Sequence, residues 1–326
     1  MPDTSHNAAA GIGFILLAML AISFNDMTIK LLSGGYPLHQ LVFFRSTIGI
    51  VFSLMLVKYE GGWRILKTSR PGLHLVRALL LVLANLTFFS ALASLQLAEV
   101  TAIFFISPLI ITLLSIPILG EKVGPLRIGA VAVGFVGVMI MVRPWAGSGG
   151  RDAAWYIYLL PVVAATAYAL SQLLTRKLGA TTRASAMAVY AQSTFIIVTV
   201  LFWMIAGDGR FVEGLENDSL VFILRAWIWP TGHDLWLFGA LALASTFGSY
   251  TVAQAYRMAN AATLSPFEYA GLPLAIMWGY VIWGDLPAPQ VMAGIALIIG
   301  SGLFVFLRER QKGRGPLTRK RINRRF

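Results

Sequence analysis

Residues 98–129 read AEVTAIFFISPLIITLLSIPILGEKVGPLRIG, and residues 262–294 read ATLSPFEYAGLPLAIMWGYVIWGDLPAPQVMAG. Both are long apolar runs interrupted by a proline, Pro108 in the first and Pro273 in the second. Each run continues through a glycine and an acid to a second proline and a glycine-containing apolar run. Such repetition predicts a duplicated chain. Proline-interrupted spans at matching places in two halves of a membrane protein indicate a transport site.

The composition is that of a membrane protein. Of 326 residues, 57% are hydrophobic and 12% are charged, whereas soluble domains have about 45 to 50% and about 25%. The absence of cysteine excludes disulfides, thiolate metal ligands and cysteine nucleophiles. The four histidines are scattered, and none forms a pair at metal-ligand spacing. We therefore expect no metal and no cofactor.

The hydrophobic runs predict an all-α integral membrane protein with ten transmembrane helices. A span needs about 20 apolar residues, and the candidates are residues 11–31, 38–57, 74–94, 99–119, 125–143, 154–174, 185–206, 235–256, 262–283 and 289–307. Five spans per half is an odd number, so the second half must enter the membrane from the opposite side. This predicts two inverted five-helix repeats, residues 11–143 and 154–307, joined by a loop at 144–153.

The placement of charge predicts the orientation. Most of the 26 Lys and Arg residues fall in alternate loops and in the tail, residues 308–326. The positive-inside rule then predicts that residues 1–10 and the tail lie in the cytoplasm. We expect the protein to lie in the inner membrane. We expect the basic tail to lie on anionic lipid headgroups and not on nucleic acid.

Asp26 and Arg45 are charges inside predicted spans. At about 1.5 Å per residue, they lie roughly 8 Å and roughly 11 Å below the outer ends of their spans, and so at one depth. In the second half they align with Gln172 and Gln192. An acid and a base are thus replaced together by neutral amides. Our hypothesis is an Asp26 to Arg45 ion pair, either structural or coupled to substrate or protons.

Glu268 has no charged counterpart, because it aligns with Phe104. It stands one turn before the helix break at Pro273, deep enough to be functional. One interpretation is a carboxylate that carries a proton or meets a cationic substrate group. The other is a carboxylate satisfied by hydroxyls or by Arg257.

Pro108 and Pro273 are predicted to break their helices and to free carbonyls beside a central cavity. Helical spacing adds polar and aromatic candidates for the cavity wall: Asn85, Tyr168, Gln172, Gln192, Tyr250, Tyr269 and Trp278.

Three further segments carry predictions. Arg77 is interpreted as an anchor that snorkels to the cytoplasmic face. The residues from Leu220 to Pro230, within the loop at 207–233, predict an interfacial helix on the outer face, with a gate as the alternative. The glycine-rich spans at 125–143 and 289–307 predict close helix packing, in a scaffold or at a dimer contact.

The two five-span halves resemble the EamA family of the drug/metabolite transporter superfamily, the second half more loosely. The likeness covers about residues 10–307, and the matching elements are Ala98-Glu99, Ser107-Pro108, Leu119-Gly120-Glu121-Lys122, Val142-Arg143-Pro144 and Phe44-Arg45. Asp285 stands where the family commonly has Glu, and the loop at 207–233 is an insertion. The resemblance implies a ten-helix inner-membrane carrier that works by alternating access without ATP.

The sequence thus predicts a secondary-active transporter of a small organic metabolite and not an enzyme. A riboflavin-type vitamin importer is the alternative, because aromatic walls suit a planar ring, and an amino-acid or amine exporter is another. A membrane enzyme or channel would need acid-rich, histidine-containing or filter motifs, which are absent. Proton coupling, the direction of transport and the oligomeric state stay open.

Overall fold

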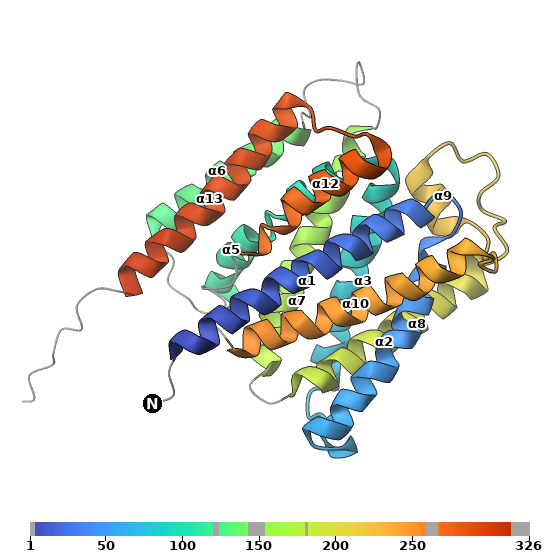
Figure 1. The fold of residues 1–326 in the computed structure, drawn as a ribbon, viewed down its shortest axis with the longest axis horizontal. Helices are drawn as coiled ribbons and strands as arrows, with labels where there is room; N and C mark the ends of the chain where they lie inside the picture. The colour runs from blue at the N-terminus through green and yellow to red at the C-terminus, as the bar shows by residue number, and fades with distance from the viewer. Residues whose placement is uncertain (1–3, 120–123, 143–153, 180–181, 259–266, 314–326) are drawn as a thin grey trace, which may run out of the picture.

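The computed structural model describes residues 4–119, 124–142, 154–179, 182–258 and 267–313. Throughout these residues the chain forms helices and no strands (Figure 1). The connecting loop predicted at 144–153 and most of the basic tail, from residue 314 onward, lie outside them.

Seven apolar helical stretches are long enough to cross a membrane, counted over the described residues. They lie in α1 (Thr4–Leu32), α2 (Leu38–Glu60), α3 (Pro71–Ser94), the joined α4 (Leu97–Phe104) and α5 (Ser107–Leu119), the joined η2 (Trp155–Tyr158) and α7 (Leu159–Gly179), α8 (Ala184–Ala206) and α10 (His233–Met258). Three shorter apolar stretches lie in α6 (Pro125–Val142), α12 (Gly271–Trp283) and α13 (Pro289–Gly313). The seven long stretches coincide with seven of the ten predicted spans, and the three shorter ones lie within the spans predicted at 125–143, 262–283 and 289–307.

The two prolines of the repeated pattern stand where helices begin anew. α4 ends at Phe104, a turn follows, and α5 begins at Ser107, which makes Pro108 its second residue. α12 begins at Gly271, which makes Pro273 its third residue. Proline is tolerated in a first helical turn because the N–H that it lacks has no partner within the helix there. Both spans are therefore divided close to their prolines.

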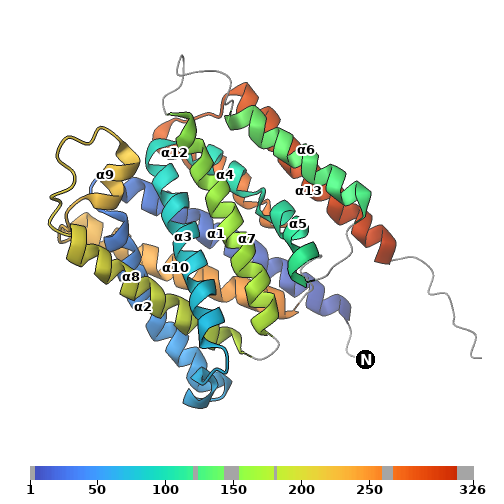
Figure 2. The same ribbon diagram turned by 180° about the vertical axis from the view of Figure 1, so that it is seen from behind.

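The helices lie side by side in pairs. α1 packs along α10, α3 along α7, α2 along α8, and α6 along α13. Both ribbon views place the α6 and α13 pair at one edge of the molecule and the α2 and α8 pair at the opposite edge (Figures 1 and 2). The other helices fill the space between these edges.

α6 and α13 approach closely through glycine, which confirms the predicted close packing. A Cβ on Gly137 would lie 2.8 Å from the carbonyl oxygen of Gly294, and a Cβ on Gly294 would lie 2.7 Å from the carbonyl oxygen of Gly137. Small residues let helix backbones approach in this way. Within this chain, the two glycine-rich helices therefore pack on each other.

The loop at 207–233 contains a shorter helix than the sequence predicts. α9 spans Asp218–Leu224, and the residues from 225 to 230 are not helical. The side chain of Asn217 accepts a hydrogen bond from the N–H of Leu220 at 3.2 Å and so caps the helix. Beyond Leu224 the backbone binds other segments: the N–H of Trp227 donates to the carbonyl oxygen of Gly207 at 3.1 Å. The prediction of a helix through Pro230 was wrong.

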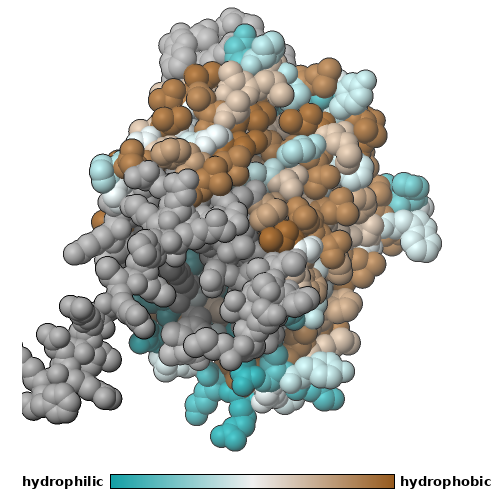
Figure 3. All heavy atoms as spheres, turned by 60° about the vertical axis from the view of Figure 1, so that its left-hand side comes forward, coloured by the Kyte–Doolittle hydropathy of each residue, from teal (hydrophilic) through white to brown (hydrophobic). Residues whose placement is uncertain are grey.

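Large apolar side chains lie on the outside of the helices. Figure 3 shows hydrophobic residues over much of the face it presents. Among those exposed by more than half of their surface are Met204, Leu243, Val281 and Leu307. A continuous apolar exterior is what hydrocarbon solvates well, and it supports a membrane-spanning protein.

Candidate functional site

Arg45 lies inside the helix bundle between two aromatic rings. Its guanidinium carbon is 5.9 Å from the ring centroid of Phe89 on α3 and 5.8 Å from that of Phe195 on α8. The residue is only 8% exposed, and it donates no hydrogen bond to any described residue. Because a guanidinium has five N–H donors, Arg45 can bind a carbonyl, carboxylate or phosphate oxygen of a ligand.

Asp26 on α1 lies close enough to Arg45 for the two charges to attract each other. Its Oδ1 accepts a hydrogen bond from Nδ2 of Asn25 at 2.9 Å. Among the described residues, Asp26 and Arg45 attract each other without the direct salt bridge that the sequence suggested, and the guanidinium lies near the rings of Phe89 and Phe195. The two opposite charges at a shared depth nevertheless come together around one site.

Trp278 on α12 joins this group from the second half. Its Nε1–H donates to Oγ of Ser23 at 3.3 Å. Its ring meets that of Phe24 edge to face, with centroids 6.1 Å apart. Ser23 lies one helical turn before Asp26 on α1, and Phe195 and Trp278 pack against the same hydrophobic cluster that contains Phe89. We call Ser23, Asp26, Arg45, Phe89, Phe195 and Trp278 the Arg45 site.

A second polar group lies around Tyr168 on α7. Tyr168 is hydrogen bonded to Gln172, and it interacts electrostatically with Glu268 and with Arg77. Its ring also packs on Phe104, with centroids 5.3 Å apart. Two predicted candidates of the second half, Tyr168 and Glu268, thus lie near each other.

Arg77 belongs to this second group. Its Nε donates to Oγ1 of Thr175 on α7 at 2.5 Å, and its Nη1 donates to the carbonyl oxygen of Met187 on α8 at 3.3 Å. Arg77 therefore links α3 to two neighbouring helices, and its role as an anchor at the membrane surface stays a prediction. We call Arg77, Tyr168, Gln172 and Glu268 the Tyr168 group.

The remaining candidates have partners other than the members of the Arg45 site. The ring of Tyr269 packs on Phe105 with centroids 5.5 Å apart, and its hydroxyl lies against Gly302 of α13. The side chain of Gln192 packs on Gly49 of α2. Tyr250 is 38% exposed, and its hydroxyl accepts a hydrogen bond from Nε2 of Gln254 at 3.0 Å.

Asn85 lines a small cavity beside the Arg45 site. This cavity of about 40 Å³ lies among α2, α3, α8 and α9, and Phe195 forms part of both its wall and the Arg45 site. Nε2 of His39, which also lines it, is buried and has no partner among the described residues. The cavity extends the Arg45 site toward α9.

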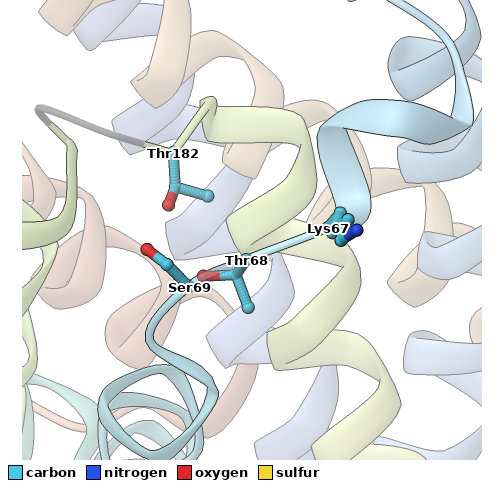
Figure 4. A pocket seen from close by; sticks show the side chains of 4 residues that line it. All are labelled: Lys67, Thr68, Ser69 and Thr182. Atoms are coloured by element: carbon cyan, nitrogen blue, oxygen red, sulfur yellow. The ribbon is translucent and has the colours of Figure 1, made fainter.

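A larger pocket lies at the opposite end of α3. It has a volume of about 310 Å³, and Lys67, Thr68, Ser69 and Thr182 line it (Figure 4). These residues belong to the segments that join α2 to α3 and α7 to α8. The pocket contains no member of the Arg45 site or the Tyr168 group.

Sequence reasoning missed Phe195, Arg77 and His39 as neighbours of the polar groups. Phe195 is one of many aromatic residues in apolar spans, and its sequence context does not distinguish it. Arg77 stands one turn inside a span, where a long side chain reaches either the interface or the bundle interior. For Phe195 and Arg77, only the contacts between helices show which polar group each residue adjoins.

Comparison with known proteins identifies the family. Residues 9–143 match the model of the EamA-like transporter family. Over 94% of its length the chain is 31% identical to a protein named riboflavin transporter from Rhizobium johnstonii, of which the match covers 91%. It is 25% identical, over 95% of its length, to a protein named S-adenosylmethionine uptake transporter from Rickettsia conorii, of which 97% is covered. One solved structure shares the fold, with a TM-score of 0.61 and 20% identity over 94% of this chain and 99% of that chain. The chain therefore belongs to the EamA-like transporter family.

Proposed function

We propose that this protein is a secondary carrier that moves a planar, riboflavin-type metabolite across the membrane by alternating access. The observation that carries the proposal is the 31% identity to a riboflavin transporter along almost the whole of both chains. The Arg45 site supports it, because a flat ring with carbonyl oxygens suits aromatic side chains with a guanidinium between them.

Two inverted five-helix repeats are part of this proposal, and the helix pairing supports them. If α1, α2, α3 and α6 correspond to α7, α8, α10 and α13, exchanging the halves turns the α1 and α10 pair into the α7 and α3 pair. The same exchange maps the α2 and α8 pair, and the α6 and α13 pair, onto themselves. All four pairs occur in the fold. A pairing that survives the exchange of halves is what an inverted repeat needs for alternating access.

We further propose an inner-membrane location with both termini in the cytoplasm. The first residues of α1 and the last residues of α13 point to the same side of the molecule in both views (Figures 1 and 2). A phosphatase or fluorescent protein fused to each terminus tests this, because the phosphatase is active only outside the cytoplasm. Phosphatase activity at either terminus would contradict the orientation.

The test of the transport function is counterflow in liposomes. Purified protein is reconstituted with unlabelled riboflavin inside, and entry of labelled riboflavin at trace concentration is followed. We expect saturable uptake that overshoots equilibrium. Arg45→Gln, which copies the counterpart Gln192, should lower uptake about tenfold or more, the effect of losing a charged hydrogen bond to the ligand. The matched control is Arg64→Gln, at an exposed position. Linear uptake that never saturates would sink the carrier proposal.

S-adenosylmethionine is the second candidate substrate, because a relative bears that name and because Asp26 and Glu268 supply negative charge for a cationic ligand. The same liposomes loaded with this compound decide between the two. If Asp26→Asn abolishes counterflow of S-adenosylmethionine and riboflavin shows none, the riboflavin-type assignment is wrong and the carrier assignment stands.

Proton coupling through Glu268 is the remaining part of the proposal. With an imposed pH gradient, uptake by the parent protein should exceed uptake without one. Glu268→Gln should remove this difference while counterflow without a gradient continues, because exchange of substrate for substrate needs no net proton movement. If the gradient stimulates the parent and the variant equally, Glu268 is not the coupling group.

A further inference from the structure

Lys30 stands two residues before the end of α1 and joins it to the ends of two other helices. Its ammonium donates to the carbonyl oxygens of Leu92, at 3.5 Å, and of Leu95. These carbonyls close the C-terminus of α3, where the helix dipole favours a positive charge. Nζ also lies 5.3 Å from the centroid of the Trp283 ring, in the last turn of α12. One side chain therefore contacts helices from both halves of the chain.

Two acids lie near enough to the same ammonium to attract it. Asp285, just beyond α12, and Glu99, in the first turn of α4, both attract Lys30, and Asp285 does so more strongly. Four helix ends, those of α1, α3, α4 and α12, thus meet at one charge. We call Lys30, Leu92, Leu95, Glu99, Trp283 and Asp285 the Lys30 cluster.

Gly284 explains how the acid is held there. The residue has φ +71° in the left-handed region and ends α12. Its N–H donates to the carbonyl oxygen of Tyr280 at 3.0 Å, while the N–H of Asp285 donates to that of Gly279 at 3.1 Å. This pair of bonds is the glycine-dependent helix end, in which the residue after the glycine is fixed against the last turn. In the second half, the glycine and acid of the repeated sequence pattern are therefore the residue that ends α12 and the acid whose backbone is fixed against its last turn.

The base also recurs in the sequence. Lys30 aligns with Arg176, and Asp285 aligns with Glu121. Each half thus has a basic residue late in its first span and an acid after the glycine that follows its fourth span. The duplication preserved the combination of base and acid, although neither the base nor the acid is identical in the two halves.

We propose that Lys30 is a positioning residue that keeps the carrier closed on the side where α1 and α12 end. The inference rests on the proposed alternating access, in which the two halves separate on one side at a time. Opening this side moves the end of α12 away from the ends of α1 and α3, so the contact of Lys30 with the Trp283 ring must break and its attraction to Asp285 must weaken. Losing them favours the conformation open to that side.

The test uses a natural advantage of the chain, which has no cysteine. A single cysteine at Ser23, buried beside Trp278 in the Arg45 site, reports access to the interior. A membrane-impermeant maleimide is applied from each side in turn, to vesicles of both orientations. In the Ser23→Cys background, Lys30→Met should raise the labelling rate from the side of Lys30 about tenfold or more, the expected effect of losing hydrogen bonds to a charged group.

Three further variants make the result specific. Asp285→Asn keeps the glycine helix end and should raise labelling in the same direction. Lys30→Arg, which keeps the charge, should label at a rate close to that of the parent. Lys58→Met, an exposed lysine in the last turn of α2, is the matched control and should change nothing.

Unchanged labelling in both Lys30→Met and Asp285→Asn would overturn the proposal. If Lys30→Met does not elute as a folded species from size-exclusion chromatography, the labelling rate of Asp285→Asn alone tests the proposal, and an unchanged rate would overturn it. The labelling needs no substrate, so its outcome is separate from that of counterflow. A protein with normal counterflow but unchanged labelling refutes the role of Lys30 and leaves the carrier in place. Raised labelling without counterflow of any metabolite refutes the carrier function and keeps the closure.

Discussion

Gln40 and Ile228 are joined by two hydrogen bonds, although they are far apart in the sequence. Nε2 of Gln40 donates to the carbonyl oxygen of Ile228 at 2.6 Å, and Oε1 of Gln40 accepts from the N–H of Ile228 at 3.3 Å. The side-chain amide of Gln40 thus satisfies both the N–H and the carbonyl oxygen of Ile228, as the backbone of a neighbouring β-strand would do. It fixes the non-helical segment after α9 to the start of α2.

Gln40→Leu should therefore destabilise the folded protein. The substitution keeps the volume of a buried side chain but leaves the N–H and carbonyl of Ile228 without this partner, at a cost of about 1 to 3 kcal/mol. Thermal unfolding in detergent measures the loss. The control Gln290→Leu, at an exposed position in the first turn of α13, should unfold with the parent. Equal midpoints for all three proteins would show that the pair contributes nothing.

The contact between α6 and α13 gives a prediction with a control on each helix. Gly137→Ala places a Cβ 2.8 Å from a backbone carbonyl oxygen, which cannot rotate away, so we expect a loss of about 1 to 3 kcal/mol from overpacking. Gly129 on α6 and Gly300 on α13 have nothing within 4 Å of such a Cβ. Alanine there should leave the unfolding midpoint unchanged or raise it, since alanine favours helix over glycine. A Gly137→Ala protein as stable as these controls would contradict the close approach.

Tyr36 and Asp234 predict a dependence on pH. The Tyr36 hydroxyl donates to Oδ2 of Asp234 at 2.6 Å. This hydrogen bond, together with burial and the nearby negative charge, raises the pKa of Tyr36 above 10.0. Because the pKa is higher in the folded than in the unfolded chain, the bond stabilises the fold below the unfolded pKa. That stability is lost as the pH rises through the folded pKa.

The experiment compares the parent with Tyr36→Phe. The parent should have the higher unfolding midpoint near pH 7, and the difference should shrink on titration toward about pH 11, past the ordinary pKa of tyrosine. Tyr59→Phe, at an exposed position, is the control for general alkaline effects. A difference that stays constant over this range would contradict the assignment.

Arg77 holds three helices together through donors that lysine cannot match. Arg77→Met should lower stability by about 1.5 to 3 kcal/mol, the contribution of hydrogen bonds to a charged group. Arg77→Lys should recover only part of it, because an ammonium lacks the planar fork that reaches both Thr175 and the Met187 carbonyl. Chemical or thermal unfolding measures both variants. A lysine variant as stable as the parent would favour a simple anchoring charge.

The sequence was sufficient to predict where the apolar segments lie, but it was insufficient to predict which helices contact each other. Length and hydropathy depend on local composition, so the ten apolar segments and the divisions near Pro108 and Pro273 were accessible. Partners depend on how each helix is rotated about its axis. The predicted depth in the membrane was enough to suggest that Asp26 and Arg45 are neighbours. It did not reveal that the guanidinium lies near the rings of Phe89 and Phe195.

The segment after α9 shows a second reason why sequence-based prediction fails. The apolar run up to Pro230 looks helical, but the structure ends the helix at Leu224. Nη1 of Arg225 donates to the carbonyl oxygen of Ser33 at 3.2 Å, and Ile228 pairs with Gln40. Hydrogen bonds to distant parts of the chain thus replace those that a continued helix would have formed. Local propensity has no access to such partners.

The glycine contact between Gly137 and Gly294 joins the last helix of one half to the last helix of the other. Each half therefore ends in a helix that packs on a helix of the other half. If residues 1–143 and 154–326 were synthesised as separate polypeptides in one membrane, α6 and α13 would provide the surface for their reassembly. A single-gene carrier with this arrangement keeps the means of assembling from two chains.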